Sequence, residues 1–355
     1  LNTMTGFGYY FYNGKYFQVW GPSKNVNPDL RWEKGKNWNI GIDFSLFNNR
    51  VYGSVNYFNR KQQDLLGNYK VSVPPYLFDE TFVNVGTMKN TGIEIDVNFK
   101  AVNTKDFSYD LNFVGTTMKN KFVDFSNSKY IGQDYYDMAG TEDPYPFYNL
   151  QRIQKGESLG NFYMWRYAGH SADGEWLVYD KDGDIIRASQ ASDADRQVVG
   201  NGMPKFTMSS SHNFHYKNFD LSLFFRGAFG YDIFNIHDFY YGTRNFTGNR
   251  LDKAYGKNFV VSGSANPVVC DYFLEKGDYL KLDMMTLGYT LNLKDCPYLD
   301  RVRVYGTMKN IFTITKFSGV DPSSYQVNGL TPGAQGSRTY FPTTRQFIVG
   351  LQIDF

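Results

Sequence analysis

Apolar and polar side chains alternate with a period of two residues over many separate stretches of this chain. In the last stretch, one parity is entirely apolar: Phe347, Val349, Leu351, Ile353 and Phe355. The same alternation recurs at four other places: 38–46, 93–99, 107–113 and 219–225. Because successive side chains of a strand point to opposite faces, these stretches predict β-strands with one apolar and one polar face. A strand of about ten residues can cross a bilayer at a tilt.

Ten strands are predicted in all, and the connections between them are uneven in length. The expected strands are 5–13, 35–47, 50–62, 88–101, 106–121, 205–216, 219–231, 278–293, 300–313 and 345–355. Short turns are expected at 48–49, 102–105, 217–218 and 294–299. They alternate with long loops at 14–34, 63–87, 122–204, 232–277 and 314–344. Outer-membrane barrels place short turns on the periplasmic side and long loops outside. The pattern therefore predicts an all-β transmembrane antiparallel barrel in which 122–204 is a large extracellular insertion.

The amino-acid composition agrees with the predicted β-strands and gives no indication of nucleic-acid binding. Aromatic residues make up 18% of the 355 residues, with 31 Phe and 29 Tyr, and these side chains favour strands and membrane interfaces. Mean hydropathy is −0.47, and no apolar run approaches the length of a membrane helix. A net charge of +2 gives no global attraction to nucleic acid.

The two cysteines and the first residues bear on processing. A predicted membrane-crossing strand separates Cys270 from Cys296, which favours independent thiols over a disulfide. No secretory signal follows Leu1, although an outer-membrane protein needs one. We therefore expect an N-terminal part to have been removed or to lie outside this sequence.

Aromatic and charged residues gather in the expected extracellular loops and suggest a ligand-binding surface. The candidate ligand-binding residues are Tyr135, Tyr136, Asp137, Trp165, Trp176, Tyr240, Tyr241 and Arg244. Flat rings stack on sugar faces while neighbouring carboxylates and amides bind hydroxyl groups, and the same set suits peptides. The alternatives are packing within the loops and contact with a lid protein.

Metal and catalytic sites are not expected. His212 and His215 lie three residues apart on a predicted strand, so their side chains point to opposite faces and cannot easily share one metal. The run Asp180 to Asp184 lacks the Gly and Glu of an EF-hand at the required positions, and it is interpreted as a solvated hairpin turn, with a different calcium site left open. No nucleophile elbow, Walker loop or zinc motif occurs, which predicts a protein that is not an enzyme and has no cofactor.

Charged residues also occupy the polar parity of the predicted strands: Asp43, Glu94, Asp96, Asp110, Arg301 and Arg303. They are expected either to contact a plug inside the barrel or to line a wet interior.

Five segments resemble, in order, the C-terminal half of SusC/RagA-type TonB-dependent outer-membrane transporters, a Bacteroidetes-type family. They are NPDLRWEKGKNWNIGIDFSLFNNRVYGSVNYFNRKQQDLL (27–66), NVGTMKNTGIEIDV (84–97), VVGNGMPKFTMSSSHNFHYKNFDLSLFFRG (198–227), GDYLKLDMMTLGYTL (277–291) and RVYGTMKNIFTITKFSGVDP (303–322). The chain then ends on Phe355, as members of that family do. Together the segments span nearly the whole chain.

The resemblance implies that residues 1–355 form about ten strands of a barrel of about 22, with the plug domain absent from this sequence. It implies TonB-dependent uptake of an oligosaccharide or oligopeptide across the Gram-negative outer membrane. The implied partners are a SusD-like surface lipoprotein, outer-membrane lipid, and the TonB-ExbB-ExbD complex, the last acting through the missing N-terminal part. Phe355 would serve as a membrane-assembly signal in the interfacial aromatic girdle. A self-contained small barrel acting as a hydrolase or an adhesin is the alternative, but open strand edges in lipid would leave backbone groups unpaired.

Overall fold

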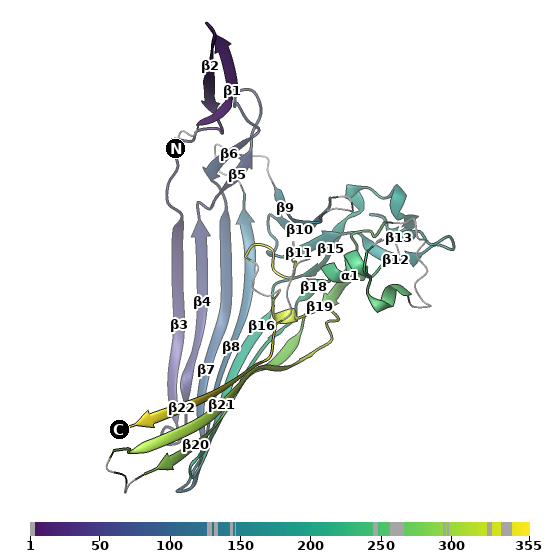
Figure 1. The fold of residues 1–355 in the computed structure, drawn as a ribbon. Helices are drawn as coiled ribbons and strands as arrows, with labels where there is room; N and C mark the ends of the chain where they lie inside the picture. Colours follow the sequence, from purple (N-terminus) through teal and green to yellow (C-terminus); the bar gives the residue numbers. More distant parts are fainter. Residues whose placement is uncertain are drawn as a thin grey trace.

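The computed structural model describes residues 4–125, 130, 134–142, 145, 147–243, 248–255, 266–293, 296, 298–324, 329–334 and 343–355. Its largest element is a curved antiparallel sheet of nine strands (Figure 1). In chain order the strands of this sheet are β3 (Lys34–Leu46), β4 (Val51–Gln63), β7 (Thr87–Asn103), β8 (Phe107–Asp124), β16 (Phe206–Tyr216), β17 (Phe219–Phe229), β20 (Tyr279–Asn292), β21 (Arg301–Thr315) and β22 (Gln346–Asp354). Each strand pairs with the next one in this order, which leaves β3 and β22 as the two edges.

The register of the sheet places the apolar parity of neighbouring strands on one face. Ile40 pairs with Tyr57 and Tyr57 with Ile93, and at the other side of the sheet Met308 pairs with both Met285 and Phe347. Directly paired residues share a face, and a shift of one residue would move every apolar side chain to the other face. The predicted alternation is thus confirmed as one continuous apolar face and one polar face.

The long loops gather at one end of the sheet and the short turns at the other (Figure 1). At the tight turn between β3 and β4, Phe47, Asn48 and Asn49 all have positive φ, which Asn tolerates better than most residues. Cys270 and Cys296 are both free, and strand β20 lies between them in the chain, as expected.

The first expected strand, 5–13, is not part of the large sheet. It forms β1 (Met4–Tyr12), which pairs with β2 (Lys15–Pro22) in a separate hairpin, so the sheet has nine strands and not ten. The physical reason is the dipeptide Asn13-Gly14, whose φ values of 48° and 75° fit a two-residue hairpin turn. Part of the expected loop 14–34 is therefore strand β2.

The loops carry four smaller sheets and short helices. The sheets are β5 (Leu66–Lys70) with β6 (Glu80–Asn84); β9 (Tyr135–Gly140), β10 (Asn149–Gln154), β11 (Asn161–Met164) and β15 (Gln197–Asn201); β12 (Arg166–His170), β13 (Trp176–Tyr179) and β14 (Ile185–Arg187); and β18 (Asp232–Phe234) with β19 (Leu274–Lys276). The helices are α1 (Ile236–Tyr241) and the 3₁₀ turns Ala188–Gln190, Asp193–Asp195, Asp252–Tyr255, Asp271–Phe273 and Pro322–Ser324. Within the described ranges, no helix is long and apolar enough to cross a membrane.

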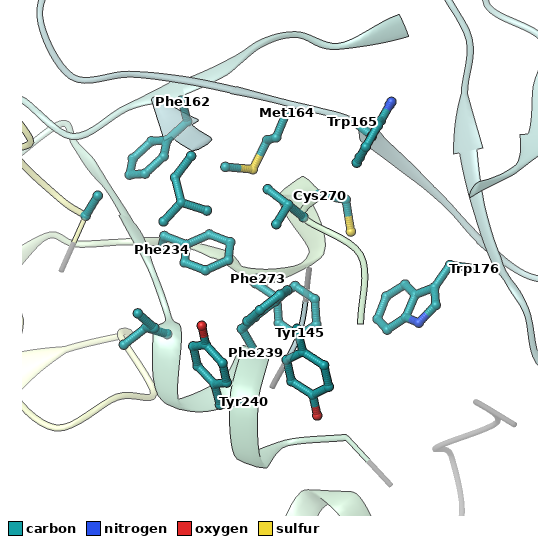
Figure 2. Close-up of a cluster of buried hydrophobic side chains, with 14 of the residues drawn as sticks. Tyr145, Phe162, Met164, Trp165, Trp176, Phe234, Phe239, Tyr240, Cys270 and Phe273 are labelled. Carbon is teal, nitrogen blue, oxygen red and sulfur yellow. The ribbon is translucent and has the colours of Figure 1, made fainter. Parts of the chain in front are cut away.

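A hydrophobic core joins the insertion to the following loop. Buried side chains from β11, β13 and α1 pack with Cys270 and Phe273 from the segment before β20 (Figure 2). The insertion and the loop 232–277 therefore form one packed unit at the loop end of the sheet, hereafter the loop module. Burial also raises the pKa of the Cys270 thiol, which keeps it protonated.

Candidate functional site

The candidate ligand-binding residues that the structure describes belong to the loop module, but their surroundings differ. Tyr135, Tyr136 and Asp137 lie on β9, and Trp165 lies between β11 and β12. Trp176 is on β13, and Tyr240 and Tyr241 end α1. Arg244 lies outside the described residues.

Three of the candidates are packing residues in this structure. Trp165, Trp176 and Tyr240 are 7%, 1% and 0% exposed within the hydrophobic core of the loop module (Figure 2). Trp165 Nε1 donates to the Ser192 carbonyl at 2.9 Å, and Tyr240 Oη donates to the Glu142 carbonyl at 2.7 Å. Their burial leaves little surface for a ligand, which fits the packing alternative.

The other candidates are more accessible. Tyr135 is 46% exposed, and Tyr136 and Tyr241 are half-buried. Tyr136 Oη donates to the Asn68 carbonyl at 2.5 Å, and its ring lies 5.2 Å from that of Phe125. Tyr136 therefore ties the insertion to the β5–β6 hairpin, while Tyr135 presents a ring to solvent.

Arg152 organises the surface around Tyr135. Its guanidinium carbon lies 4.0 Å from the ring centre of Tyr135 and 3.9 Å from that of Tyr163, so the cation is stacked between two aromatic rings. The same guanidinium donates two hydrogen bonds to Asp137, from Nε at 2.6 Å and from Nη2 at 2.9 Å. Arg152 pairs with Asp137 across β9 and β10, so the sheet register holds this fork in place.

The stack continues through a second arginine. The Arg196 guanidinium lies 5.2 Å from the ring centre of Tyr163 and 5.7 Å from that of Trp165. Arg196 Nη1 donates to Asp193 Oδ1 at 2.8 Å, and Asp193 Oδ2 lies 3.4 Å from Arg152 Nη2. We call this alternation of Tyr135, Arg152, Tyr163, Arg196 and Trp165 the aromatic–arginine stack.

The charges in the stack are mutually stabilised. Burial alone would lower the pKa of Arg152, but its hydrogen bonds to Asp137 and the nearby negative charges outweigh burial and raise that pKa. The hydrogen bond from Arg196 lowers the pKa of Asp193, and the charge of Arg152 acts in the same direction. The side chain of Asp193, which pairs with both arginines of the stack, is 66% exposed, so this surface offers solvent both the Tyr135 ring and a carboxylate.

Sequence reasoning identified Tyr135 and Asp137 but missed Arg152, Tyr163, Asp193 and Arg196. Their proximity depends on the pairing of β9, β10, β11 and β15, which are spread over residues 135–201 of the chain. The sequence did place an Arg and an Asp in neighbouring segments of one insertion. The register that pairs these two strands could not be predicted from the local sequence.

The histidine and aspartate motifs have structural explanations. His212 lies on the apolar face, where Nδ1 is 2.8 Å from Tyr109 Oη and Nε2 is 3.1 Å from Ser210 Oγ. His215 pairs with Asp220 on the polar face, as the period of two predicted. Asp180 Oδ1 accepts from the backbone N–H groups of Asp182 and Asp184, which confirms the hairpin turn.

No group of three or more His, Cys, Asp or Glu side chains suited to a metal occurs among the described residues.

Several polar-face charges are paired within the sheet. Arg303 binds Asp220, Arg301 binds Asp354, and Glu94 lies 4.0 Å from Arg60. Asp96 Oδ1 accepts from the side-chain amides of Asn98 and Asn112. Contact with a plug and a wet interior therefore both stay predictions for the polar face.

Comparison with known proteins shows that this chain is similar to TonB-dependent receptors. Residues 2–311 match the family described as TonB dependent receptor-like, beta-barrel. TonB-dependent receptor P3 of Formosa agariphila is 28% identical, over 93% of this chain and 35% of that protein. TonB-dependent receptor SusC of Bacteroides thetaiotaomicron is also 28% identical, over 94% of this chain and 33% of that protein. The chain thus spans about a third of the length of these curated relatives.

A solved structure shares the fold. The RagAB peptide transporter superposes with a TM-score of 0.80 at 22% identity, over 100% of this chain and 38% of the matched chain. The "open-open" state of the RagAB peptide importer superposes with a TM-score of 0.77. The nine-stranded sheet with its loop module is thus a recurring arrangement and corresponds to part of a larger barrel.

Proposed function

The chain belongs to the TonB dependent receptor-like β-barrel family, and from this premise we propose that the whole protein imports an oligosaccharide across the Gram-negative outer membrane with energy supplied through TonB. Residues 1–355 would form the C-terminal half of the barrel. No chemical bond of the ligand would be made or broken.

The observation that carries the proposal is the two-faced nine-stranded sheet with every long loop at one end. An apolar outer face suits lipid, and a polar inner face suits an aqueous passage. Among the described residues, the edge strands β3 and β22 each pair with a strand on one side alone, and lipid cannot satisfy the backbone groups of an open edge. We propose that further strands and a plug domain, supplied by the rest of a longer polypeptide, close the barrel.

We propose two sets of partners. A SusD-like lipoprotein would dock on the loop module and deliver ligand, because that module lies at the end of the sheet where the long loops gather (Figure 1). The TonB-ExbB-ExbD complex would act from the periplasm on the missing N-terminal part. Phe355, which follows β22 and is 87% exposed, would act as the membrane-assembly signal at the periplasmic rim.

Among the candidate residues, we propose that Tyr135, Tyr136, Asp137 and Tyr241 form ligand contacts, with Arg152 fixing Tyr135 and Asp137 in place. Trp165, Trp176 and Tyr240 would instead hold the shape of the loop module. The exposed Tyr135 ring beside carboxylates fits a sugar face flanked by hydroxyl groups. An oligopeptide is the second candidate ligand, because the same rings and charges also suit peptide side chains and termini.

The experiment is deletion of the full-length gene in its native host, followed by growth on single carbon sources. Loss of growth on one oligosaccharide, with monosaccharide growth intact, is the expected result. Loss of growth only on oligopeptides would select the second ligand class. Normal growth on both classes, with the protein expressed in the parent strain, would contradict a role in nutrient import. Affinity purification of the tagged full-length protein tests the partner separately, and we expect a lipoprotein to co-purify in equal amount.

A further inference from the structure

Four lysines form one row across four adjacent strands of the large sheet. Lys36 on β3 pairs directly with Lys61 on β4. Lys61 pairs with Lys89 on β7, and Lys89 pairs with Lys121 on β8. Neighbouring strands lie about 4.8 Å apart, so the row spans roughly 15 Å at one level of the barrel. We call these four residues the lysine row.

The lysine row lies on the apolar face, at its extracellular edge. Lys36 shares the parity of Ile40, and Lys89 shares that of Ile93, both of which face outward. Each lysine lies two or three residues from the strand end that leads to a long loop. The row is therefore where an apolar, lipid-facing surface meets the outer boundary of the membrane.

Like charges directly opposite each other on paired strands destabilise a sheet. The described residues include no carboxylate that forms an ion pair with any member of the row, although Lys34, at the start of β3, pairs with Asp64 3.5 Å away. Three successive Lys–Lys pairs therefore repel one another within the chain itself. Anions bound beside the row would offset this repulsion.

A hollow of about 680 Å³ adjoins one end of the row. Its lining includes Lys121 together with Lys119 and Lys205, and also Tyr57 and Ile93 of the apolar face. Glu157 is the acidic residue that contributes to the lining. Along β7 and β8, Lys89 and Lys121 lie nearer the loop end than Ile93, which is the order in which a lipid presents its headgroup and its acyl chain.

We propose that the lysine row binds the phosphate groups of a phosphorylated glycolipid in the outer leaflet of the outer membrane. Each ammonium group can donate charge-assisted hydrogen bonds to phosphate oxygens, and clustered lysines at a membrane surface attract anionic headgroups. A lipid is favoured over free phosphate because the basic groups continue directly into the lipid-facing surface. This binding does not depend on which ligand the protein transports.

The test uses the full-length protein in detergent micelles, with diphosphorylated lipid A as the probe and its dephosphorylated form as the comparison. The variant Lys61→Gln, Lys89→Gln, Lys121→Gln removes three charges from the row. The matched control Lys100→Gln, Lys105→Gln, Lys217→Gln removes three charges near the short turns at the other end of the strands. Gln keeps a polar side chain of similar length, and relief of repulsion should leave the variant folded, as heat-modifiable gel mobility would verify.

We expect the variant to bind the diphosphorylated probe about tenfold or more weakly, while the control binds as the parent does. We also expect the parent to prefer the diphosphorylated probe over the dephosphorylated one. Unchanged affinity in the variant, an equal loss in the control, or equal binding of both probes would overturn the proposal. Displacement of the bound glycolipid by millimolar inorganic phosphate would also overturn it, since the row would then be a general anion site.

Discussion

Lys281 and Asp321 form a buried ion pair that joins strand β20 to the loop after β21. Lys281 Nζ lies 3.2 Å from Asp321 Oδ2, and the two side chains are 2% and 5% exposed. Asp321 also accepts from Ser323 N–H at 2.9 Å and from Thr343 Oγ1 at 2.7 Å. One carboxylate therefore ties together a barrel strand and both ends of the last long loop.

Acid should release this loop at a pH set by Asp321. Burial alone would raise the pKa of Asp321, but hydrogen bonds from Thr343 and Ser323 and the charge of Lys281 outweigh it and lower the pKa below 3.8. A lowered carboxyl pKa stabilises the folded state above the unfolded-state value, and this contribution is lost as the pH falls through the folded-state value. The protection factors for backbone hydrogen exchange at 316–324, which are corrected for the intrinsic pH dependence of exchange, should thus be equal at about pH 7 and pH 5 and lower near pH 3.

Asp321→Asn provides the control for that measurement. The variant leaves the buried Lys281 without its nearer carboxylate partner, so its loop should have low protection factors at neutral pH that change little on acidification. If the parent loop opened between about pH 7 and pH 5, another group would be responsible.

The two faces of the sheet can be compared at neighbouring positions. Val97 pairs with Gly53 and Phe113 on the apolar face, whereas Asn98 lies on the polar face and accepts from Asn112 Nδ2 at 3.0 Å. Val97→Arg in the full-length protein should reduce the unfolding free energy in lipid vesicles by roughly 2–4 kcal/mol. Asn98→Arg should cost much less, because the polar face admits water. Equal losses in urea unfolding would mean that the faces are assigned incorrectly.

Gly288 allows an arginine to cross its strand. Arg303 Nε reaches Asp220 Oδ1 at 2.9 Å, and a Cβ at position 288 would lie 2.4 Å from that oxygen and 2.6 Å from Arg303 Nη2. Gly288→Ala should displace the flexible ends of this partly exposed pair and reduce stability by about 0.2–1 kcal/mol, the usual contribution of such an ion pair. Gly306→Ala is the matched control, because nothing lies within 4 Å of its added Cβ. Similar urea midpoints for both variants would contradict this role of Gly288.

Arg152 should contribute more to ligand binding by the loop module than other arginines do. Arg152→Ala removes the fork to Asp137 and the stacking on Tyr135 and Tyr163, so it should lower ligand affinity about tenfold or more by releasing those groups. Arg152→Lys should restore little, because lysine cannot form the fork. Arg187→Ala, at an exposed pair with Asp173, is the control and should bind ligand normally. Calorimetric titration that finds equal affinity in both alanine variants would exclude the stack from binding.

How well the sequence predicted each feature depends on how far apart in the chain the interacting residues lie. Strand parity is local, so residues such as Ile93 and Phe347 could be assigned to one face from the alternation alone. The hairpin at Asn13-Gly14 carried a local turn signal that the strand pattern of 5–13 masked. Burial of Trp176 and Tyr240, and the meeting of Arg152 with Asp137, depend on contacts between distant segments. Sequence composition in the loops could therefore mark aromatic residues but could not separate those that pack from those that face solvent.

The central claim is that the full-length protein is an energised importer, and uptake of labelled ligand by living cells tests it most directly. Surface binding and internalisation should be measured with and without a protonophore, and in a strain that lacks TonB. We predict that collapse of the proton gradient or loss of TonB abolishes internalisation and leaves surface binding intact. Internalisation that continues under both conditions would contradict the account, because the protein would then be a passive pore.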